Sequence, residues 1–263
     1  MSILLREDAD GIATLTLNQP EKLNPLSEAM LAALQGQFDA LMEDRGTRAV
    51  VIRGAGKAFC AGHDLREMAA GRQAEDGGAA YFRELFAQCA RMMTTIPKLP
   101  QPVIAEVHGI ATAAGCQLVA SCDMAVAAET ARFGVNGVNI GLFCSTPMVA
   151  LSRNIPRKHA FEMLTTGGFV DAERAGELGL VNRVVPEAEL SGAAQELAKT
   201  VAAKLASAVR VGKRAFYDQL EMGLEDAYAY TGEVMALNMA DADTAEGIAA
   251  FLEKRDARWK NPD

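Results

Sequence analysis

Three short, unbroken apolar runs constrain the fold of this chain more than any other feature. They occupy residues 49–53, 103–107 and 124–128, and the first two lead into glycine-containing turns. A strand that is apolar at nearly every position is buried on both faces, as in parallel sheets covered by helices. The segment between the second and third runs, residues 113–120, has the composition of a helix. This order of strand, glycine turn, helix and strand predicts an α/β fold.

Elements on either side of these runs have recognisable starts and stops. Residues 12–17 alternate in a strand-like way, and the proline-containing segment 18–25 is a loop. Ser27 fits a helix N-cap. The apolar positions that follow it recur every three or four residues and form one buried helix face; they are Leu31, Leu34, Phe38 and Leu41.

The second half of the chain changes character after Pro186. Before it, Asp171 caps a helix that stops at Gly179, and a strand is expected over residues 180–185. After it, Ala, Leu, Glu and Lys dominate, and Asp243-Thr244-Ala245-Glu246 fits a capping box for the last helix. We therefore expect an α/β core over residues 1–195 and a helical C-terminal region over residues 196–263.

Charge and cysteine usage narrow the classes of function. The 263 residues carry a formal net charge of −8, which argues against binding to nucleic acid or to an anionic membrane. The five cysteines have no C-x-x-C spacing, and with three histidines they form no metal pattern. The first residues lack the basic and apolar segments of a secretory signal, and no apolar run is long enough to cross a membrane. We expect buried thiols, no bound metal and a cytoplasmic protein.

Two turns rich in small residues are the candidates for chemistry. Residues 57–65 follow the first apolar run, and residues 108–118 follow the second and open a helix. Small residues let a ligand approach backbone N–H groups closely, and two such donors aimed at one point would form an oxyanion hole. Composition alone favours a plainer interpretation, in which these are packing turns. The nearby Gly54-Ala55-Gly56 lacks the third glycine of a dinucleotide-binding motif.

The order and spacing of several blocks resemble the crotonase superfamily, also called the enoyl-CoA hydratase/isomerase family. The segment 141–147 resembles one divergent branch, the enoyl-CoA hydratase domain-containing proteins. The resemblance implies a spiral of repeated ββα units with a C-terminal helical trimerisation region, and a homotrimer or a hexamer of two trimers. The blocks that carry it are residues 17–20, 24–26, 58–62, 121–123, 133–134, 175–186 and 250–255.

The resemblance also implies a ligand and its contacts. The ligand is an acyl-CoA thioester of fatty-acid or related metabolism, with coenzyme A as part of the substrate and no permanently bound cofactor. Its carbonyl oxygen would accept hydrogen bonds from the backbone N–H groups of His63 and Ala114. Cations for the phosphates would include Lys22, Lys57 and, from the last helix of a neighbouring subunit, Lys254. The other implied substrate contacts are Leu23, Ala61, Asp64, Leu65, Gly115, Asn136, Cys144 and Phe251.

The chain departs from the family pattern at the two positions that carry the acid/base glutamates of a hydratase. Gln117 and Gly137 stand there, and neither accepts a proton at neutral pH. The leading interpretation is an acyl-CoA-binding enzyme that stabilises a thioester enolate. Decarboxylation, double-bond migration and acyl-CoA binding without catalysis are the alternatives. His63 favours decarboxylation among these, because some decarboxylases of the superfamily carry a histidine there to hold a carboxylate.

Overall fold

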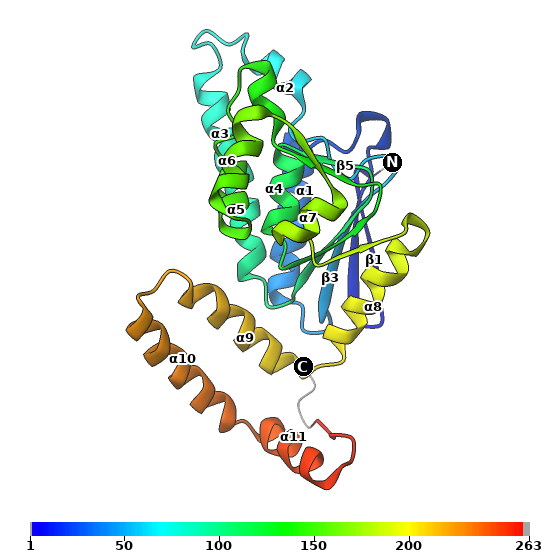
Figure 1. Cartoon of the computed structure of the whole chain (residues 1–263), viewed down its shortest axis with the longest axis vertical. Helices are drawn as coiled ribbons and strands as arrows, with labels where there is room; N and C mark the ends of the chain where they lie inside the picture. Colours follow the sequence, from blue (N-terminus) through cyan, green and yellow to red (C-terminus); the bar gives the residue numbers. More distant parts are fainter. Residues whose placement is uncertain (1, 260–263) are drawn as a thin grey trace.

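Six strands form the main sheet of the computed structural model, which describes residues 2–259 (Figure 1). Their order is β1-β2-β3-β4-β6-β9. β1 pairs antiparallel with β2, and every later pair is parallel. The three apolar runs become β3, β4 and β6 in the middle of this sheet, as predicted. The strands span Leu4–Ala9, Ile12–Leu17, Ala49–Gly54, Val103–Val107, Met124–Ala128 and Arg183–Val185.

A second, smaller sheet holds β5 (Ile110–Thr112), β7 (Arg132–Gly134) and β8 (Phe169–Asp171), in the order β5-β7-β8. The chain alternates between the two sheets, because β4 leads to β5 and β6 leads to β7. Each visit to both sheets forms one turn of a spiral. The predicted α/β spiral of ββα units is confirmed.

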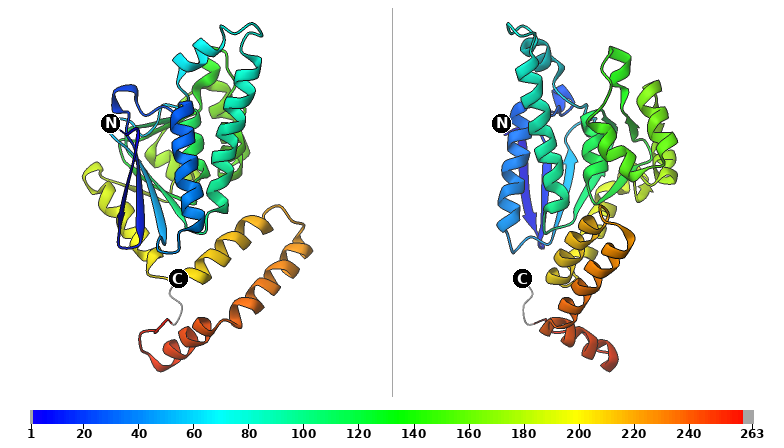
Figure 2. Two further views of the ribbon diagram at one scale, coloured as in Figure 1. Left: turned by 180° about the vertical axis from the view of Figure 1, so that it is seen from behind. Right: turned by 90° about the vertical axis from the view of Figure 1, so that its left-hand side faces the viewer.

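Helices cover both faces of the main sheet (Figure 2). α1 (Glu28–Glu43), α3 (Ala79–Thr95) and α4 (Ala114–Ser121) contribute to the larger hydrophobic core, and α8 (Leu190–Ala202) covers the opposite face. The remaining α-helices are α2 (Leu65–Gly71), α5 (Pro147–Asn154), α6 (Arg157–Thr166), α7 (Ala172–Leu178), α9 (Ala206–Gln219), α10 (Leu224–Met239) and α11 (Ala242–Glu253). Short 3₁₀ turns are η1 (Pro20–Lys22), η2 (Ile96–Lys98), η3 (Asn136–Ile140) and η4 (Glu187–Glu189).

Most local predictions are confirmed, and two need correction. The Ser27 hydroxyl caps α1, and Asp171 caps α7, which ends at Gly179. The strand expected over residues 180–185 is shorter, because the Leu180 N–H bonds back to the Ala175 carbonyl at the end of α7 and Leu180 joins the hydrophobic core. The cap of α11 is Asp241 instead of Asp243, because the Asp241 carboxylate accepts the Asp243 N–H.

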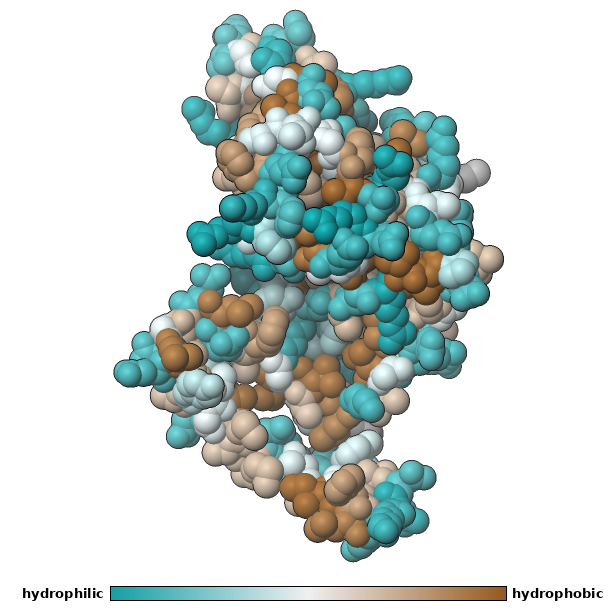
Figure 3. All heavy atoms as spheres, in the orientation of Figure 1, coloured by the Kyte–Doolittle hydropathy of each residue, from teal (hydrophilic) through white to brown (hydrophobic). Residues whose placement is uncertain are grey.

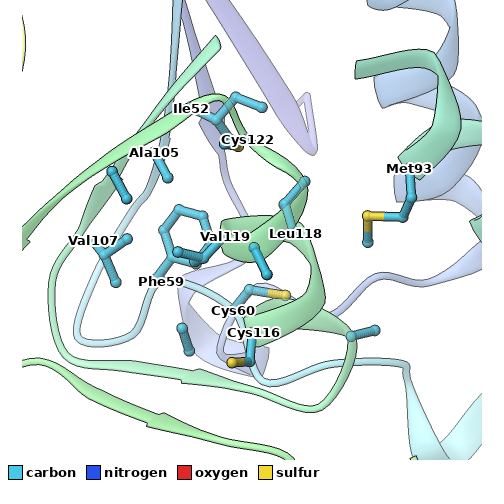
Figure 4. Close-up of a cluster of buried hydrophobic side chains, with 14 of the residues drawn as sticks. Ile52, Phe59, Cys60, Met93, Ala105, Val107, Cys116, Leu118, Val119 and Cys122 are labelled. Carbon is cyan, nitrogen blue, oxygen red and sulfur yellow. The ribbon is translucent and has the colours of Figure 1, made fainter. Parts of the chain in front are cut away.

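The hydrophobic core lies between the main sheet and α1, α3 and α4. Figure 4 shows Phe59 beside Val107 and Val119, with Cys60 and Cys116 nearby. Phe59 is fully buried. All five cysteines are buried free thiols, as the cysteine pattern predicted. Small side chains in this core let α4 pack closely against the turns that precede it.

Three helices after α8 form an arm that extends away from the sheets (Figures 1 and 2). The predicted boundary at residue 195 lies inside α8, which packs on the sheet, so the arm begins only with α9. Apolar side chains remain exposed along the arm, as the lower part of Figure 3 shows. Six that are at least 70% exposed are Leu224, Tyr228, Met235, Leu237, Phe251 and Leu252. In residues 2–259 no helix is both long and apolar enough to cross a membrane.

A buried ion pair joins the arm to the core. The Lys213 ammonium on α9 donates to the Asp123 carboxylate at 2.7 Å and to the carbonyls of Ile96 and Gln101, both at 2.8 Å. Asp123 also accepts from the Tyr217 hydroxyl and from a backbone N–H of β4. Burial lowers the pKa of Lys213, and the charge of Asp123 opposes that shift. All three protons of the ammonium therefore have acceptors, which fixes the base of the arm.

Candidate functional site

A cavity of about 310 Å³ lies where the two small-residue turns meet. Its walls come from the first turn, from α2 and α3, from the start of α4 and from the segment after β7. The lining residues are Ala61, His63, Leu65, Met68, Phe86, Thr112, Ala113, Ala114, Asn136, Gly137, Asn139, Ile140, Leu142, Phe143, Cys144, Ser145, Thr146 and Pro147. This volume is at the lower end of the range for drug-sized ligands.

The two turns touch each other at Gly62. This residue has φ of +92°, which favours glycine, and a Cβ there would lie 2.9 Å from the Ala113 Cβ and 3.3 Å from the Ala114 nitrogen. His63 follows Gly62, so its amide and the Ala114 amide belong to two segments in van der Waals contact. Glycine at position 62 is what permits this approach.

The N–H groups of His63 and Ala114 have no hydrogen-bond acceptor within residues 2–259. Ala114 is the first residue of α4, where N–H groups lack partners in their own helix. The positive end of the helix dipole adds to the attraction for negative charge at this point. Two free donors on the wall of an apolar cavity can stabilise charge that develops on a ligand oxygen.

Asn24 holds the first turn in place, a role that no pattern in the sequence indicates. Its side chain is fully buried. The Asn24 amide group donates to the carbonyls of Ala55 and Ala58, both at 2.8 Å, and accepts the Gln19 N–H at 2.9 Å. Backbone bonds from Ala61 to Leu23 and from Leu26 to Gly62 complete the attachment. The predicted contacts Leu23 and Ala61 are thus neighbours.

His63 contributes a neutral imidazole to the cavity wall. Its Nδ1 lies 3.1 Å from the Leu26 carbonyl, which only accepts hydrogen bonds, so Nδ1 carries the proton. The buried Nε2 is then an acceptor, and no described residue donates to it. Burial lowers the pKa of His63, and the bond to Leu26 offsets this only in part. The ring is therefore uncharged at neutral pH, with Phe86 packed edge-on against it.

Cys144 is not an activated nucleophile. Burial raises the pKa of its thiol, so the thiolate is scarce at neutral pH. Near it, Asn136 accepts a hydrogen bond from the Thr112 hydroxyl at 2.7 Å through Oδ1, which leaves its amide N–H groups for a ligand. Cys144 therefore does not serve as a nucleophile, and the Asn136 amide is available to hydrogen-bond a ligand.

Gly137 has no room for any side chain. A Cβ at this position would lie 2.4 Å from the Leu142 carbonyl oxygen and 2.8 Å from the Cys144 sulfur. The Leu142 N–H donates to the Gly137 carbonyl at 3.0 Å, so this turn is closed by its own backbone. A glutamate at position 137 would require the segment 137–144 to move. The resemblance in the sequence predicts that a hydratase carboxylate is missing at this position, but it gives no indication of this steric restriction.

Gln117, the other predicted acid/base position, lies outside the cavity lining. It is buried on α4, and its Oε1 has no donor in the described chain. Gly115 packs on the far side of the turn, where a Cβ would meet the Cys60 carbonyl. Asp64 caps α2 by accepting the Arg66 and Glu67 N–H groups.

The predicted cations and the last helix lie away from the cavity lining. Lys22 ends η1, beside Leu23 in the loop that supports the first turn. Lys57 lies in the loop after β3. Phe251 and Lys254 are at the end of α11, remote from the sheets in both views (Figures 1 and 2). Their assignment to a neighbouring subunit's site remains a prediction.

Seven of the predicted residues are brought together around the cavity: Ala61, His63, Leu65, Ala114, Asn136, Gly137 and Cys144. Sequence reasoning missed Met68 and Phe86. Met68 follows Leu65 at helical spacing, which could have indicated a shared face. Phe86 had no local signal, because only the packing of α3 places it against His63.

Comparisons with known proteins agree on the family. The model of the enoyl-CoA hydratase/isomerase family matches residues 7–262. Enoyl-CoA hydratase domain-containing protein 3, mitochondrial, is 45% identical in Homo sapiens, over 96% of this chain and 82% of the relative. The Xenopus laevis protein of that name is 46% identical, over 95% and 83%. The crystal structure of an enoyl-CoA hydratase from Mycobacterium smegmatis has a TM-score of 0.95 and 55% identity, covering 98% of this chain and 99% of that one.

The predicted cytoplasmic location is wrong in the light of these relatives. The human and Xenopus laevis proteins are both named as mitochondrial. The prediction rested on the unpaired thiols, on the first few residues and on the lack of a membrane-length apolar run. None of these features distinguishes the cytoplasm from another reducing compartment.

Proposed function

The chain belongs to the enoyl-CoA hydratase/isomerase family, and from this membership we propose that its cavity binds an acyl-CoA thioester and stabilises the thioester enolate. One observation carries the proposal. The N–H groups of His63 and Ala114 lack acceptors among the described residues and lie on two touching turns at the cavity wall. Loss of a proton or of another group from Cα places negative charge on the carbonyl oxygen. Each preorganised donor there lowers the barrier by about 3 kcal/mol.

The rest of the ligand would follow the first turn. Leu23 and Ala61 are joined by a backbone hydrogen bond, and both lie next to Lys22 and the start of α2. This arrangement suits coenzyme A, with its nucleotide along the loop and its phosphates near Lys22 and Lys57. A second copy of the chain would supply Phe251 and Lys254, and its arm would cover the exposed apolar side chains of α10 and α11. We propose a homotrimer or a pair of trimers for this reason.

Hydration is not the reaction we propose. Adding water across a double bond needs groups that take and give protons. No carboxylate lines the cavity within the described residues. Gln117 lies outside the lining, and the turn at Gly137 has no space for a glutamate. We expect little loss of the conjugated-thioester absorbance with enoyl-CoA substrates, and hydratase turnover at ordinary rates would contradict this.

Double-bond migration is a second candidate, and His63 favours it. Among the lining side chains of the described chain, its neutral imidazole is the one with a basic nitrogen, Nε2, that has no hydrogen-bond partner, and burial lowers its pKa. A single base could take a proton from one carbon of an enoyl thioester and return it to another, with the enolate held between the two steps. His63→Gln keeps the backbone donor and removes the base, so it should abolish migration while thioester binding persists. Retained migration would exclude His63 as the base.

The direct test of enolate stabilisation is the infrared stretching frequency of the bound thioester carbonyl. Two hydrogen bonds should lower this frequency relative to the free thioester. Ala114→Pro removes one donor at the first position of α4, where proline is tolerated in helices. We expect part of the shift to be lost.

Arg157→Pro is the matched control for this variant. It makes the same change at the first position of α6, away from the cavity, and should leave the carbonyl frequency as in the wild type. Absence of a shift in the wild-type protein itself would contradict the proposed function, whether or not Ala114→Pro folds.

A further inference from the structure

The cavity lining carries no formal charge. Among the lining residues of the described chain there is no Asp, Glu, Lys or Arg. The two titratable side chains are His63 and Cys144, and burial favours the neutral form of each. A ligand group that enters this cavity therefore meets dipoles and apolar surface, and no counter-ion.

The hydrogen bonding of His63 strengthens this conclusion. Its one proton lies on Nδ1 and is donated to the Leu26 carbonyl, so Nε2 presents a lone pair. A carboxylate needs donors, and next to this nitrogen it would meet a second acceptor. Asn139 donates to the Gly167 carbonyl at 3.3 Å, and the amide N–H groups of Asn136 offer neutral donors but no positive charge. The geometry thus disfavours the decarboxylase interpretation of His63, in which the side chain holds a carboxylate.

Large apolar side chains continue from the cavity to the surface. Four apolar lining residues are substantially exposed: Leu65 at 56%, Ile140 at 64%, Leu142 at 41% and Phe143 at 38%. We call these four residues the apolar rim. They come from the start of α2, from the end of η3 and from the segment between η3 and α5. Because they line the cavity as well as the surface, a ligand that enters the cavity and extends outward would cover them.

We infer that the cavity takes an uncharged acyl chain long enough to cross the apolar rim, and that it rejects acyl groups ending in a carboxylate. The inference rests on the proposed function, since it names the acyl group of the proposed thioester. Each methylene that leaves water for apolar surface should strengthen binding by up to about fourfold. A terminal carboxylate buried without a counter-ion should weaken binding by about tenfold or more.

Calorimetric titration with saturated thioesters tests both parts. Acetyl-, hexanoyl-, decanoyl- and tetradecanoyl-CoA measure the effect of chain length. Pentanoyl- and glutaryl-CoA have the same carbon count and differ in the terminal carboxylate. We expect affinity to rise along the first series until the chain has crossed the rim, and glutaryl-CoA to bind at least about tenfold more weakly than pentanoyl-CoA.

A rim variant shows where the chain-length effect arises. Phe143→Ser should reduce the gain in affinity from hexanoyl- to decanoyl-CoA. Phe161→Ser is the matched control, because Phe161 on α6 is 63% exposed and does not line the cavity. It should retain the full chain-length gain.

The outcomes separate the inference from the function on which it rests. Equal affinity for all the saturated thioesters, or equal affinity for glutaryl- and pentanoyl-CoA, would overturn the inference and leave the proposed function standing. A Phe161→Ser effect as large as that of Phe143→Ser would also overturn it. If no thioester binds, acetyl-CoA included, the proposed function fails and the inference fails with it.

Discussion

The α/β core and the C-terminal arm use apolar side chains in opposite ways. In the core, helix α1 buries its apolar face completely, and Phe38 and Leu34 have no exposed surface. In the arm, helix α10 is as long as α1, yet Ala227 is its one buried residue. Leu224 and Leu237 on α10 are 75% and 72% exposed. The two helices are equally long, but only the core helix finds its packing partners within the same chain.

This difference shows that apolar side chains in the two regions have different packing partners. Those in the core pack against segments of the same chain that are far apart in the sequence. Arm positions expose more apolar surface than a solitary helix pair would tolerate, which is typical of surfaces that bind protein. The Asp123–Lys213 pair lies at the border, where it fixes the first arm helix to the core.

The largest difference in stability between core and arm variants should come from replacing one phenylalanine in each region by alanine. Phe59→Ala in the core should lower the free energy of unfolding by about 3–5 kcal/mol, because it opens a cavity among fully buried neighbours. Phe251→Ala in the arm, where the ring is 83% exposed, should change it by less than about 0.5 kcal/mol at low protein concentration. Urea denaturation measures both. Equal losses would show that the arm is as well packed as the core.

Removing the ion pair that joins the core to the arm should have the next largest effect on the free energy of unfolding. Lys213→Met should cost about 3 kcal/mol in urea denaturation, because it leaves the buried Asp123 carboxylate without its cation. Lys199→Met is the control, since Lys199 meets Asp10 at 3.6 Å on the surface and such pairs contribute little. A Lys213→Met protein as stable as the control would mean that the ion pair does not hold the arm to the core.

Adding a side chain at Gly137 in the cavity wall should have a smaller effect on the free energy of unfolding. Gly137→Ala should cost about 1–3 kcal/mol, because the new methyl group would press on the Leu142 carbonyl, which is backbone and cannot rotate away. The same change at Gly192 on α8 has open space around it and should leave stability unchanged or slightly higher. Thermal unfolding distinguishes the two. A neutral Gly137→Ala would imply that the segment 137–144 moves easily and that a side chain there is tolerated.

The smallest expected change in stability comes from a substitution in the arm that also tests whether the arm forms an interface. Gly232 lies within α10, and nothing is within 4 Å of a Cβ placed there. Gly232→Ala should therefore stabilise the dilute protein by about 0.5–1 kcal/mol through helix propensity. If a second copy packs against this face, the same methyl group should weaken assembly, which sedimentation at increasing concentration would detect. Gain in stability with no change in assembly would place Gly232 outside any interface.

The fold was largely predictable because its determinants are local patterns. The runs over residues 49–53, 103–107 and 124–128 are apolar enough that only central strands suit them, and Ser27 and Asp171 mark helix starts by their chemistry. The strand after Gly179 was predicted too long, because Leu180 is apolar for a different reason: it packs in the core beside the end of α7. The periodicity of apolar residues does not distinguish a leucine in a strand from a leucine that packs in the core beside the end of a helix.

The site was predictable only in part. The two turns could be identified because both combine small residues with a strand end, and the family pattern paired them. Asn24 and Phe86 could not be assigned roles, since their contacts cross long stretches of chain. The Asn24 side chain reaches carbonyls 31 and 34 residues away. The lack of space at Gly137 likewise depends on the backbone of Leu142, which no residue pattern encodes.

The buried thiols give the protein an internal set of chemical reporters. Burial raises the pKa of Cys60, Cys89 and Cys116 to about 12, so alkylating reagents, which attack the thiolate, should label them only when the core opens. Cys144 lines the cavity, so its labelling should respond to whether the cavity is filled. One alkylation time course, analysed by peptide mass, would thus record global opening and ligand occupancy separately, with no introduced probe.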